Sequence, residues 1–436
     1  MVTPTLTVEI GFNGAGNNTY LLFDDTTRGK FGTGTFAAGV YFTDVTSHVV
    51  DVTIDRGRSR PLETFKPGTC TITLDNTSGD YDPHNLSGPY VAAGTTQVLP
   101  MVPVRVRATV GGTTYDLYYG YVDKWRQNQR GVATAQTVVT CTDGMKILAA
   151  YEPGATSNSA GGGEDTGARV GRILNLVGIP AGDRDLDVGD STLQATMLAG
   201  NVLTQIDDAV RSEQGYFWVA PNGKYTFRNR TSRYGTFITG LIGGGGGVTF
   251  TAMTFTNVTT VAEPVANTYE TVELSYDDEL IKNAVGATRT GGTLQPVSDS
   301  ASVARYTTKS HNVADLWLET DLAALNWANQ ILVSSKDAEQ RVDKIVVAPA
   351  IYWTADRWQT LLGMEFGATV QVTYRPVAGD DVVVILFYDG IHVGVRDGTL
   401  WDVEMACTST SGYDNPIVFQ EAAVPGSGFD AFQFTF

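Results

Sequence analysis

Positive charge is scarce in this sequence. Lysine and arginine together number 30, against 47 aspartates and glutamates, and the formal net charge is −17. A nucleic-acid-binding surface needs clustered lysine and arginine to neutralise phosphates, so the composition argues against specific nucleic-acid binding. The plain interpretation of this balance is an acidic soluble protein.

Cysteine and long apolar runs are also scarce. The three cysteines (Cys70, Cys141 and Cys407) lie far apart in apolar alternations, which predicts buried, reduced thiols and no metal site. The first ten residues lack the basic and apolar segments of a signal peptide. No apolar stretch approaches the ~20 residues of a membrane helix. We therefore expect a chain made in a cytoplasm, without a membrane segment.

Catalytic and metal-binding motifs are missing as well. The sequence contains no H-E-x-x-H, G-x-S-x-G or Walker pattern, and its four histidines are scattered. The one catalytic arrangement that the sequence leaves open is a Ser-His-Asp or Cys-His site whose residues are distant in sequence and meet in the fold. Alternate aspartates at 183, 185, 187 and 190 invite a calcium site, but Val188 and Gln194 stand where an EF-hand has glycine and glutamate. An acidic solvated turn is the better interpretation, so we predict no enzyme, cofactor or metal.

What the sequence does contain is the signature of strands. Glycine is abundant at 48 residues, and 436 residues suggest two to four domains. Apolar and polar residues alternate in 70–74 and 104–110, and Gly111-Gly112 marks a hairpin turn. These patterns predict antiparallel strands with one buried face.

The predicted N-terminal β domain covers residues 1–151, and a linker follows at 152–165. The domain begins with a hairpin of residues 6–12 and 20–23. Further strands are expected near 49–54, 70–74, 102–110, 114–122 and 136–142.

A small α+β domain is predicted at 166–263. Apolar residues at helical spacing follow Thr166 and end at Gly178, and Asn201 is the expected N-cap of a second helix. A hairpin of 216–219 and 225–228 follows, and the glycines at 243–247 predict a flexible loop.

A second β domain is predicted at 264–415. It begins with a strand bearing Val272, Leu274 and Tyr276, followed by a polar connection and the longest helix, from Thr320 or Asp321. Expected strands are 344–348, 369–374, 382–388, 391–395 and 400–407. The apolar run at 382–388 predicts burial on both faces, either in the core of this domain or at a subunit interface.

Two segments are candidate interfaces between subunits. Arg56, Arg58 and Arg60 form an alternating basic run, either a solvated turn or a salt-bridge patch facing a neighbour's acidic surface. The tail at 416–436 carries aromatic residues that either add to a neighbour's sheet edge or pack on their own domain. The tail residues concerned are Phe429, Phe432, Phe434 and Phe436.

Several motifs carry a resemblance to a known family. The runs RGR at 56–58, PGT at 67–69, LDN at 74–76, DYDP at 80–83 and GYVDKW at 120–125 resemble minor tail proteins of long-tailed bacteriophages that infect actinobacteria. From Ala168 to about Cys407, the order of elements is similar to the baseplate hub, or tail-tip hub, family.

The resemblance implies a mainly β fold with an α+β insertion: two similar β-barrel-like hub domains and a small helix–hairpin domain. It implies a structural, non-enzymatic virion protein at the tail tip, made in the host cytoplasm. A homotrimer would form a ring around the DNA channel, and DNA would pass through its lumen. Its partners would be distal tail or tail tube proteins, the tape measure protein, and fibre or spike proteins.

An internal echo fits this implication. Residues 104–141 and 370–407 share the order strand, turn, strand and final strand ending in cysteine. Three copies, each with two similar β domains, would place six similar domains in a ring. Such a ring matches the six-fold symmetry of a tail tube.

Three alternatives stay open. The first is a distal tail protein, which forms a homohexameric ring. The second is a carbohydrate- or receptor-binding tail module, in which Trp317, Trp353 and Trp358 would stack on sugars. The third is a tail-associated cell-wall hydrolase.

Overall fold

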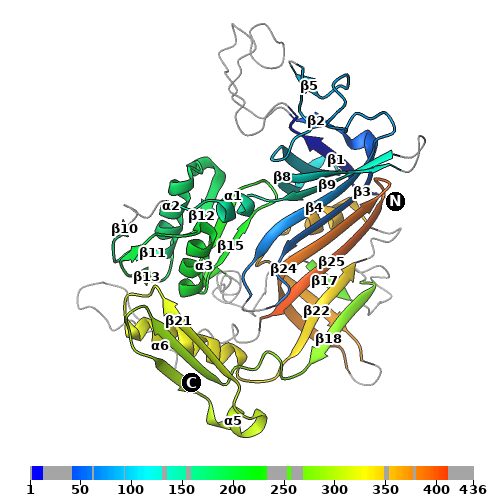
Figure 1. Ribbon diagram of the computed structural model, residues 1–436. Coiled ribbons are helices and arrows are strands. Elements are labelled where there is room, and N and C mark those ends of the chain that lie inside the picture. Colours follow the sequence, from blue (N-terminus) through cyan, green and yellow to red (C-terminus); the bar gives the residue numbers. More distant parts are fainter. Residues whose placement is uncertain are drawn as a thin grey trace.

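Strands dominate the architecture, as the sequence predicts. The structure, a computed structural model, describes residues 2–12, 42–60, 63–92, 94–129, 135–153, 159–232, 253–256, 269–347, 353–376 and 380–410. These residues form a 13-stranded sheet with the main order β18-β22-β25-β24-β3-β4-β9-β8-β7-β1-β2 (Figure 1). β23 pairs with β24 beside this path, and β17 pairs with β23.

The first half of the sheet is a set of antiparallel strands that we call unit 1, in the order β3-β4-β9-β8-β7. Its strands are β3 (Val49–Gly57), β4 (Lys66–Asp75), β7 (Pro103–Val110), β8 (Thr113–Gln129) and β9 (Ala135–Thr142). Outside it lie β1 (Thr5–Ile10), β2 (Thr43–Asp44), the 3-10 turn η1 (Thr46–His48) and the small hairpin of β5 (Val91–Ala92) and β6 (Thr95–Thr96).

The second half, unit 2, repeats this topology in the antiparallel order β18-β22-β25-β24-β23. Its strands are β18 (Thr271–Tyr276), β22 (Gln340–Val347), β23 (Thr369–Tyr374), β24 (Val382–Arg396) and β25 (Leu400–Ser409). β17 (Met253–Thr256) runs parallel to β23. In both units the first two strands of the chain pair with each other, and a meander of three strands follows.

The two meanders also share a local irregularity in their long central strand. Asp123 is the extra residue of a bulge in β8, and Val122 before it lies opposite Cys141. Asp389 is the extra residue in β24, and Tyr388 before it lies opposite Cys407. The bulges therefore fix which residues of the two units correspond.

Alternation of residue type explains the strands of unit 1. Cys70, Ile72 and Leu74 are buried, and the threonines between them lie on the other face. Cys70 lies opposite Cys141 on the neighbouring strand. All three cysteines are free and buried, as predicted, and burial raises the pKa of the Cys70 and Cys141 thiols.

A helical unit (residues 145–228) lies beside the sheet (Figure 1). The predicted cap is confirmed: the Asn201 side chain accepts a hydrogen bond at the start of α3, and Gly178 ends α2 as predicted, with a positive φ. The Asp165 side chain, which was not predicted as a cap, accepts a hydrogen bond at the start of α2. Its helices are α1 (Met145–Ala150), α2 (Thr166–Val177), the 3-10 turn η2 (Ala181–Asp183) and α3 (Val202–Glu213). Its strands are β10 (Ser159–Ala160), β11 (Glu164–Asp165), β12 (Arg184–Leu186), β13 (Thr192–Leu193), β14 (Thr196–Met197), β15 (Tyr216–Val219) and β16 (Tyr225–Arg228).

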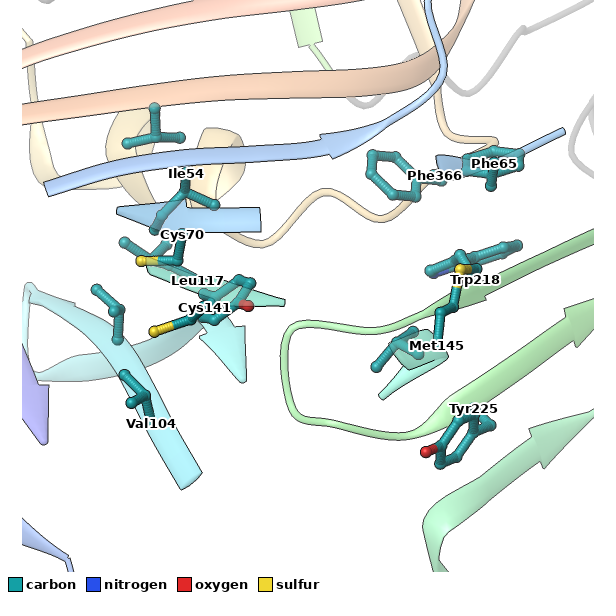
Figure 2. Close-up of a cluster of buried hydrophobic side chains, with 14 of the residues drawn as sticks. Ile54, Phe65, Cys70, Val104, Leu117, Cys141, Met145, Trp218, Tyr225 and Phe366 are labelled. Carbon is teal, nitrogen blue, oxygen red and sulfur yellow. The ribbon is translucent and has the colours of Figure 1, made fainter. Parts of the chain in front are cut away.

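Aromatic packing attaches the helical unit to the sheet. Figure 2 shows Trp218 of β15 beside Phe65 and Phe366, and its ring centroid lies 5.4 Å from Phe65 and 5.8 Å from Phe366. The Tyr225 hydroxyl donates to the Gly144 carbonyl at 3.0 Å. The hairpin predicted at 216–228 is thus both confirmed and placed against the sheet.

The polar connection predicted between residue 276 and the long helix is wrong, because the segment folds. β19 (Ala284–Arg289), β20 (Gln295–Ser298) and β21 (Ser310–Leu316) form a sheet, with α5 (Ser300–Tyr306) and α6 (Asp321–Ser335) beside it. We call residues 284–335 the insert, which has its own apolar core. α6 starts at Asp321 as predicted, with Thr320 as its N-cap, and its buried stripe includes Ala328 and Leu332 together with Trp327.

The core of the domain buries only the second half of the run 382–388, and burial of its first half at a subunit interface stays a prediction. Val383 is 55% exposed, whereas Leu386, Phe387 and Tyr388 are buried. Among the described strands, only β23 flanks the first part of β24, while from Leu386 onward β25 covers the other edge. The strands predicted at 382–388 and 391–395 form one strand, because the bulge at Asp389 interrupts the pattern without ending the pairing.

α7 (Ala355–Leu362) covers the unit 1 hairpin, where Gln359 donates to the Val110 carbonyl oxygen at 3.2 Å. Several predictions lie outside the described residues: the strand at 20–23, the glycines at 243–247 and the tail at 416–436. The predicted domain boundaries and the barrel shape of the hub domains stay predictions. In the predicted linker, residues 159–165 carry β10 and β11.

Candidate functional site

The histidines are each held by separate contacts. His48 contacts the Tyr81 hydroxyl at 2.6 Å, and His311 stacks with Trp327. The other two contact aspartates: His84 with Asp82 at 3.2 Å, and His392 with Asp55 at 2.6 Å. Across the described ranges, no group of three or more His, Cys, Asp or Glu side chains could hold a metal ion. The chemistry of these residues does not outline a catalytic centre.

The acidic loop suspected of binding calcium is engaged by arginines. Arg228 donates to Asp185 at 2.5 Å and to Asp187 at 3.4 Å, and Arg230 lies 3.9 Å from Asp190. The Arg228 bond lowers the pKa of Asp185 below its ordinary range. These pairs fasten the loop to the end of β16.

The tryptophans considered for sugar stacking are not exposed. Trp317, Trp353 and Trp358 are 9%, 4% and 2% exposed, and Trp353, Trp358 and Trp401 pack edge to face. The Trp358 indole donates to the Val2 carbonyl at 2.9 Å. The suggestion that these three residues bind carbohydrate is therefore wrong, since a stacked sugar needs an open ring face.

The feature that joins the two units is the pairing of β3 with β24. The strands are antiparallel, with Asp51 opposite Arg396 at one end and Gly57 opposite Gly390 at the other. Ile54 and Val393 lie opposite each other and are both buried. We call this pairing the junction, and it makes the cores of both units continuous.

A buried ion pair fastens one end of the junction. Arg58 donates from Nη2 to Asp389 Oδ2 at 3.0 Å, and the two side chains are 7% and 0% exposed. Thr408 also donates to that oxygen, at 2.6 Å. The Arg58 guanidinium lies over the rings of Phe65 and Tyr216, at 5.2 and 4.9 Å from their centroids. The Arg58 guanidinium therefore contacts β24, the segment around Phe65 and the helical unit.

Two glycines permit the close approach of the strands. Gly57 has φ +101°, and a Cβ placed there would lie 2.2 Å from the Asp389 carbonyl oxygen. A Cβ on Gly390 would lie 2.6 Å from the Arg58 carbonyl oxygen. No side chain fits between these backbones, so both positions require glycine.

A second buried carboxyl ties unit 1 to the helical unit. Asp143 accepts from the Gly68 N–H at 2.6 Å and from the Met145 N–H at 2.9 Å. Burial raises its pKa from 3.8 to about 7, against the opposing effect of these N–H groups and of Arg56. This carboxyl positions the start of α1 against β4.

The arginine run predicted as an interface is used within the described chain. Arg56 donates to the Val219 carbonyl at 3.2 Å and lies over the Phe366 ring. Arg58 pairs with Asp389, and the half-exposed Arg60 pairs with Glu279. An inter-subunit role for the run stays a prediction, as does that of the phenylalanines at 429, 432, 434 and 436, which lie outside the described residues.

Sequence reasoning missed Asp389 and Asp143. The signal for Asp389 is present, because it directly follows the apolar run from Val382 to Tyr388, and a charge buried there needs a partner. That partner, Arg58, is 331 positions away.

Comparisons with known proteins find similarity in structure. No protein-family model and no curated protein matches the sequence. A 43 kDa tail protein of prophage MuSo2 from Shewanella oneidensis is 13% identical with a TM-score of 0.52, covering 87% of this chain and 98% of the other. A tail protein from Neisseria meningitidis is 12% identical with a TM-score of 0.53, covering 94% and 98%.

A component of the type VI secretion system of E. coli is 10% identical with a TM-score of 0.44, covering 84% of this chain and 74% of the other. The two closer likenesses show that this chain has the fold of those tail proteins. None of the helices in the described part of the chain is long and apolar enough to cross a membrane.

Proposed function

We propose that the chain is a structural component of a bacteriophage tail tip, a baseplate hub of an actinobacterial phage. It forms a ring that connects the tail tube to tip, fibre or spike proteins. The observation that carries this proposal is the repeated topology: units 1 and 2 have the same strand order, and their bulges coincide. The shared fold with two tail proteins, over almost their whole length, supports it.

Symmetry gives the proposal its mechanism. Three copies of a chain with two equivalent units present six similar surfaces, which suits a tail tube of six-fold symmetry. The ring surrounds the DNA channel, and the net charge of −17 disfavours adhesion of DNA phosphates to it. Its partners are distal tail or tube proteins, the tape measure protein, and fibre or spike proteins.

The protein acts mechanically and catalyses no reaction. Its interfaces hold a channel that is blocked before infection and opens when the tip engages a cell. The chain is made in the host cytoplasm and resides at the tip of the virion tail.

Copy number and symmetry in purified tails test the proposal. Quantitative mass spectrometry is expected to find three copies per tail, and electron micrographs a three-fold ring at the tip. Six copies in a six-fold ring would identify a distal tail protein instead. Cell-wall hydrolysis by the purified protein would overturn the structural assignment.

A further inference from the structure

One edge of the large sheet ends at β18. This strand pairs with β22 on one side, and no strand in the described ranges pairs with its other side. Its side chains are open to solvent: Leu274 is 38% and Tyr276 is 69% exposed, and Glu273 is exposed as well. Unpaired apolar edge strands invite pairing with another chain.

A second unpaired edge lies along the last part of β8. Tyr121 is the last residue of β8 to pair with β7, on the side opposite β9. From Lys124 onward, β8 pairs with β9 alone among the described strands. Lys124 and Arg126 are exposed there, and neither forms an ion pair with a residue that the structure describes.

The corresponding edge of unit 2 is occupied. Along one edge, β24 pairs with β23 up to Phe387, and from Gly390 onward the same edge pairs with β3. β3 holds the same place in unit 1 that β18 holds in unit 2. The pairing of β3 with β24 is therefore a template for the unpaired edge of β8, and the equivalent partner strand is β18.

We propose that β18 of one copy pairs, antiparallel, with the Lys124–Gln129 edge of β8 in a second copy of this chain. The inference rests on the proposed function, since it names the contact that closes the ring. Each copy offers one β18 edge and one β8 edge, so the contact between copies is head-to-tail. Such contacts form a closed ring when the rotations between successive copies add up to a full turn. It also covers both open edges.

The bulges fix the register. Lys124 and Gly390 each follow the bulge residue, so Asn128 corresponds to Gly394. Thr53 lies opposite Gly394, and the equivalent of Thr53 in β18 is Glu273. Glu273 is therefore expected opposite Asn128, and two further pairs follow from it: Ser275 with Arg126, and Asp277 with Lys124.

Charge and polarity match in this register. On one face, Glu273 approaches Arg126, and Asp277, which also pairs with Arg341 of its own copy at 2.7 Å, approaches Lys124, so acids meet bases across the strands. On the other face, Leu274 and Tyr276 meet Gln127 and Trp125. That face corresponds to the core side of the junction, where Ile54 and Val393 are buried.

The contact between copies differs from the junction in one respect. The position equivalent to Arg58 is Asp278, and the equivalent of Asp389 is Asp123, which pairs with Lys146 at 2.5 Å. No buried ion pair fastens the contact between copies. Exposed charges steer it, so its strength falls as salt rises.

Disulfide cross-linking tests the register. The double variant Ser275→Cys/Arg126→Cys, oxidised with diamide, is expected to give a covalent closed trimer on a non-reducing gel. The equivalent pair inside the chain, Asp55→Cys/His392→Cys, is the matched positive control and forms a disulfide without a gain in mass. The displaced pair Ser275→Cys/Asn128→Cys is the register control and stays largely unlinked, because its Cα atoms are too far apart.

Mixing the two single variants shows that the bond joins different copies. Ser275→Cys and Arg126→Cys proteins, combined and oxidised, are expected to give a linked dimer that neither gives alone. Equal linking of the displaced pair overturns the inference, and so does a protein that stays unlinked at every concentration. Three copies in purified tails without cross-linking leave the proposed function standing. If the purified protein forms the linked trimer but is absent from purified tails, the proposed function fails and the contact between copies stands.

Charge reversal gives an independent readout. Lys124→Glu/Arg126→Glu is expected to raise the dissociation constant of the assembly about tenfold or more at low salt, with a smaller effect at high salt. Lys224→Glu, at an exposed turn of the helical unit, is the matched control and leaves it unchanged. An equal effect of the two variants contradicts the inference.

Discussion

Arg58 and Asp389 show how one buried charge joins three parts of the chain. Taking both ions out of water is costly, and the cost is offset only because hydrogen bonds from Thr408 and the Arg58 guanidinium converge on the carboxylate. Arg58 also donates to the Glu63 carbonyl at 3.0 Å. The pair therefore acts as a structural staple at the junction.

Removing one partner of this pair should be costly. Arg58→Ala leaves Asp389 buried without its cation, and we expect a loss of about 3–5 kcal/mol in the free energy of unfolding. Urea titration followed by tryptophan fluorescence measures it. The double variant Arg58→Met/Asp389→Leu, which removes both charges, should lose less. A change of under about 1 kcal/mol for Arg58→Ala would show that the pair is not buried as described.

Asp143 predicts a pH dependence of stability. Its pKa is raised in the folded protein to about 7 from 3.8, so the folded state holds the proton more tightly than the unfolded chain. Its contribution is fully present below about pH 4 and is lost as the pH rises through 7, by about 4 kcal/mol at most. Asp143→Asn cannot ionise, so the wild-type-minus-variant difference in unfolding free energy should fall over this range.

Urea unfolding at a series of pH values measures that difference. The exposed Thr399 supplies the control, since Thr399→Ser changes no ionisable group and should give a difference independent of pH between 4 and 7. A flat difference for Asp143→Asn would mean that the carboxyl is hydrated in the folded protein.

At the scale of elements, the junction depends on backbone contact. Gly57→Ala places a methyl group against the Asp389 carbonyl oxygen at a positive φ, so either β3 or β24 must shift. We expect a loss of at least about 2 kcal/mol in unfolding free energy and faster amide exchange along β24. Gly394→Ala, in the partner strand β24 of the same junction, is the matched control, because its Cβ meets only Asp402 Cβ at 3.6 Å. Equal effects of the two substitutions would contradict the close approach.

The sequence predicts elements well where the signal is local. The alternation around Ile72 and the cap at Asn201 each involve neighbours a few residues apart, and both are confirmed. The junction could not be predicted, because β3 pairs with a strand more than 300 positions later. The strands of the insert were missed because their pattern is weak: β20 has no fully buried residue, and β19 buries small residues such as Gly286 and Ala287.

At the scale of the whole molecule, the buried apolar residues form two separate clusters, and we expect each cluster to unfold cooperatively. Units 1 and 2 and the helical unit share one apolar cluster, whereas the insert has its own. Ile72 is 0% exposed in the first cluster and Ile331 is 5% exposed in the second. Substituting either with alanine leaves a cavity and costs about 2–5 kcal/mol within its own cluster.

Hydrogen exchange followed by mass spectrometry separates the two. Ile72→Ala lies in unit 1, yet it should speed amide exchange in β22 of unit 2 as well as in β4, because the junction makes both units open together. Ile331→Ala should speed exchange in β19 and β21 and leave β4 nearly unchanged. If Ile72→Ala affected β4 and left β22 protected, the junction would not couple the units. The two halves would then be separate building blocks joined by a chain, rather than one rigid segment of a ring.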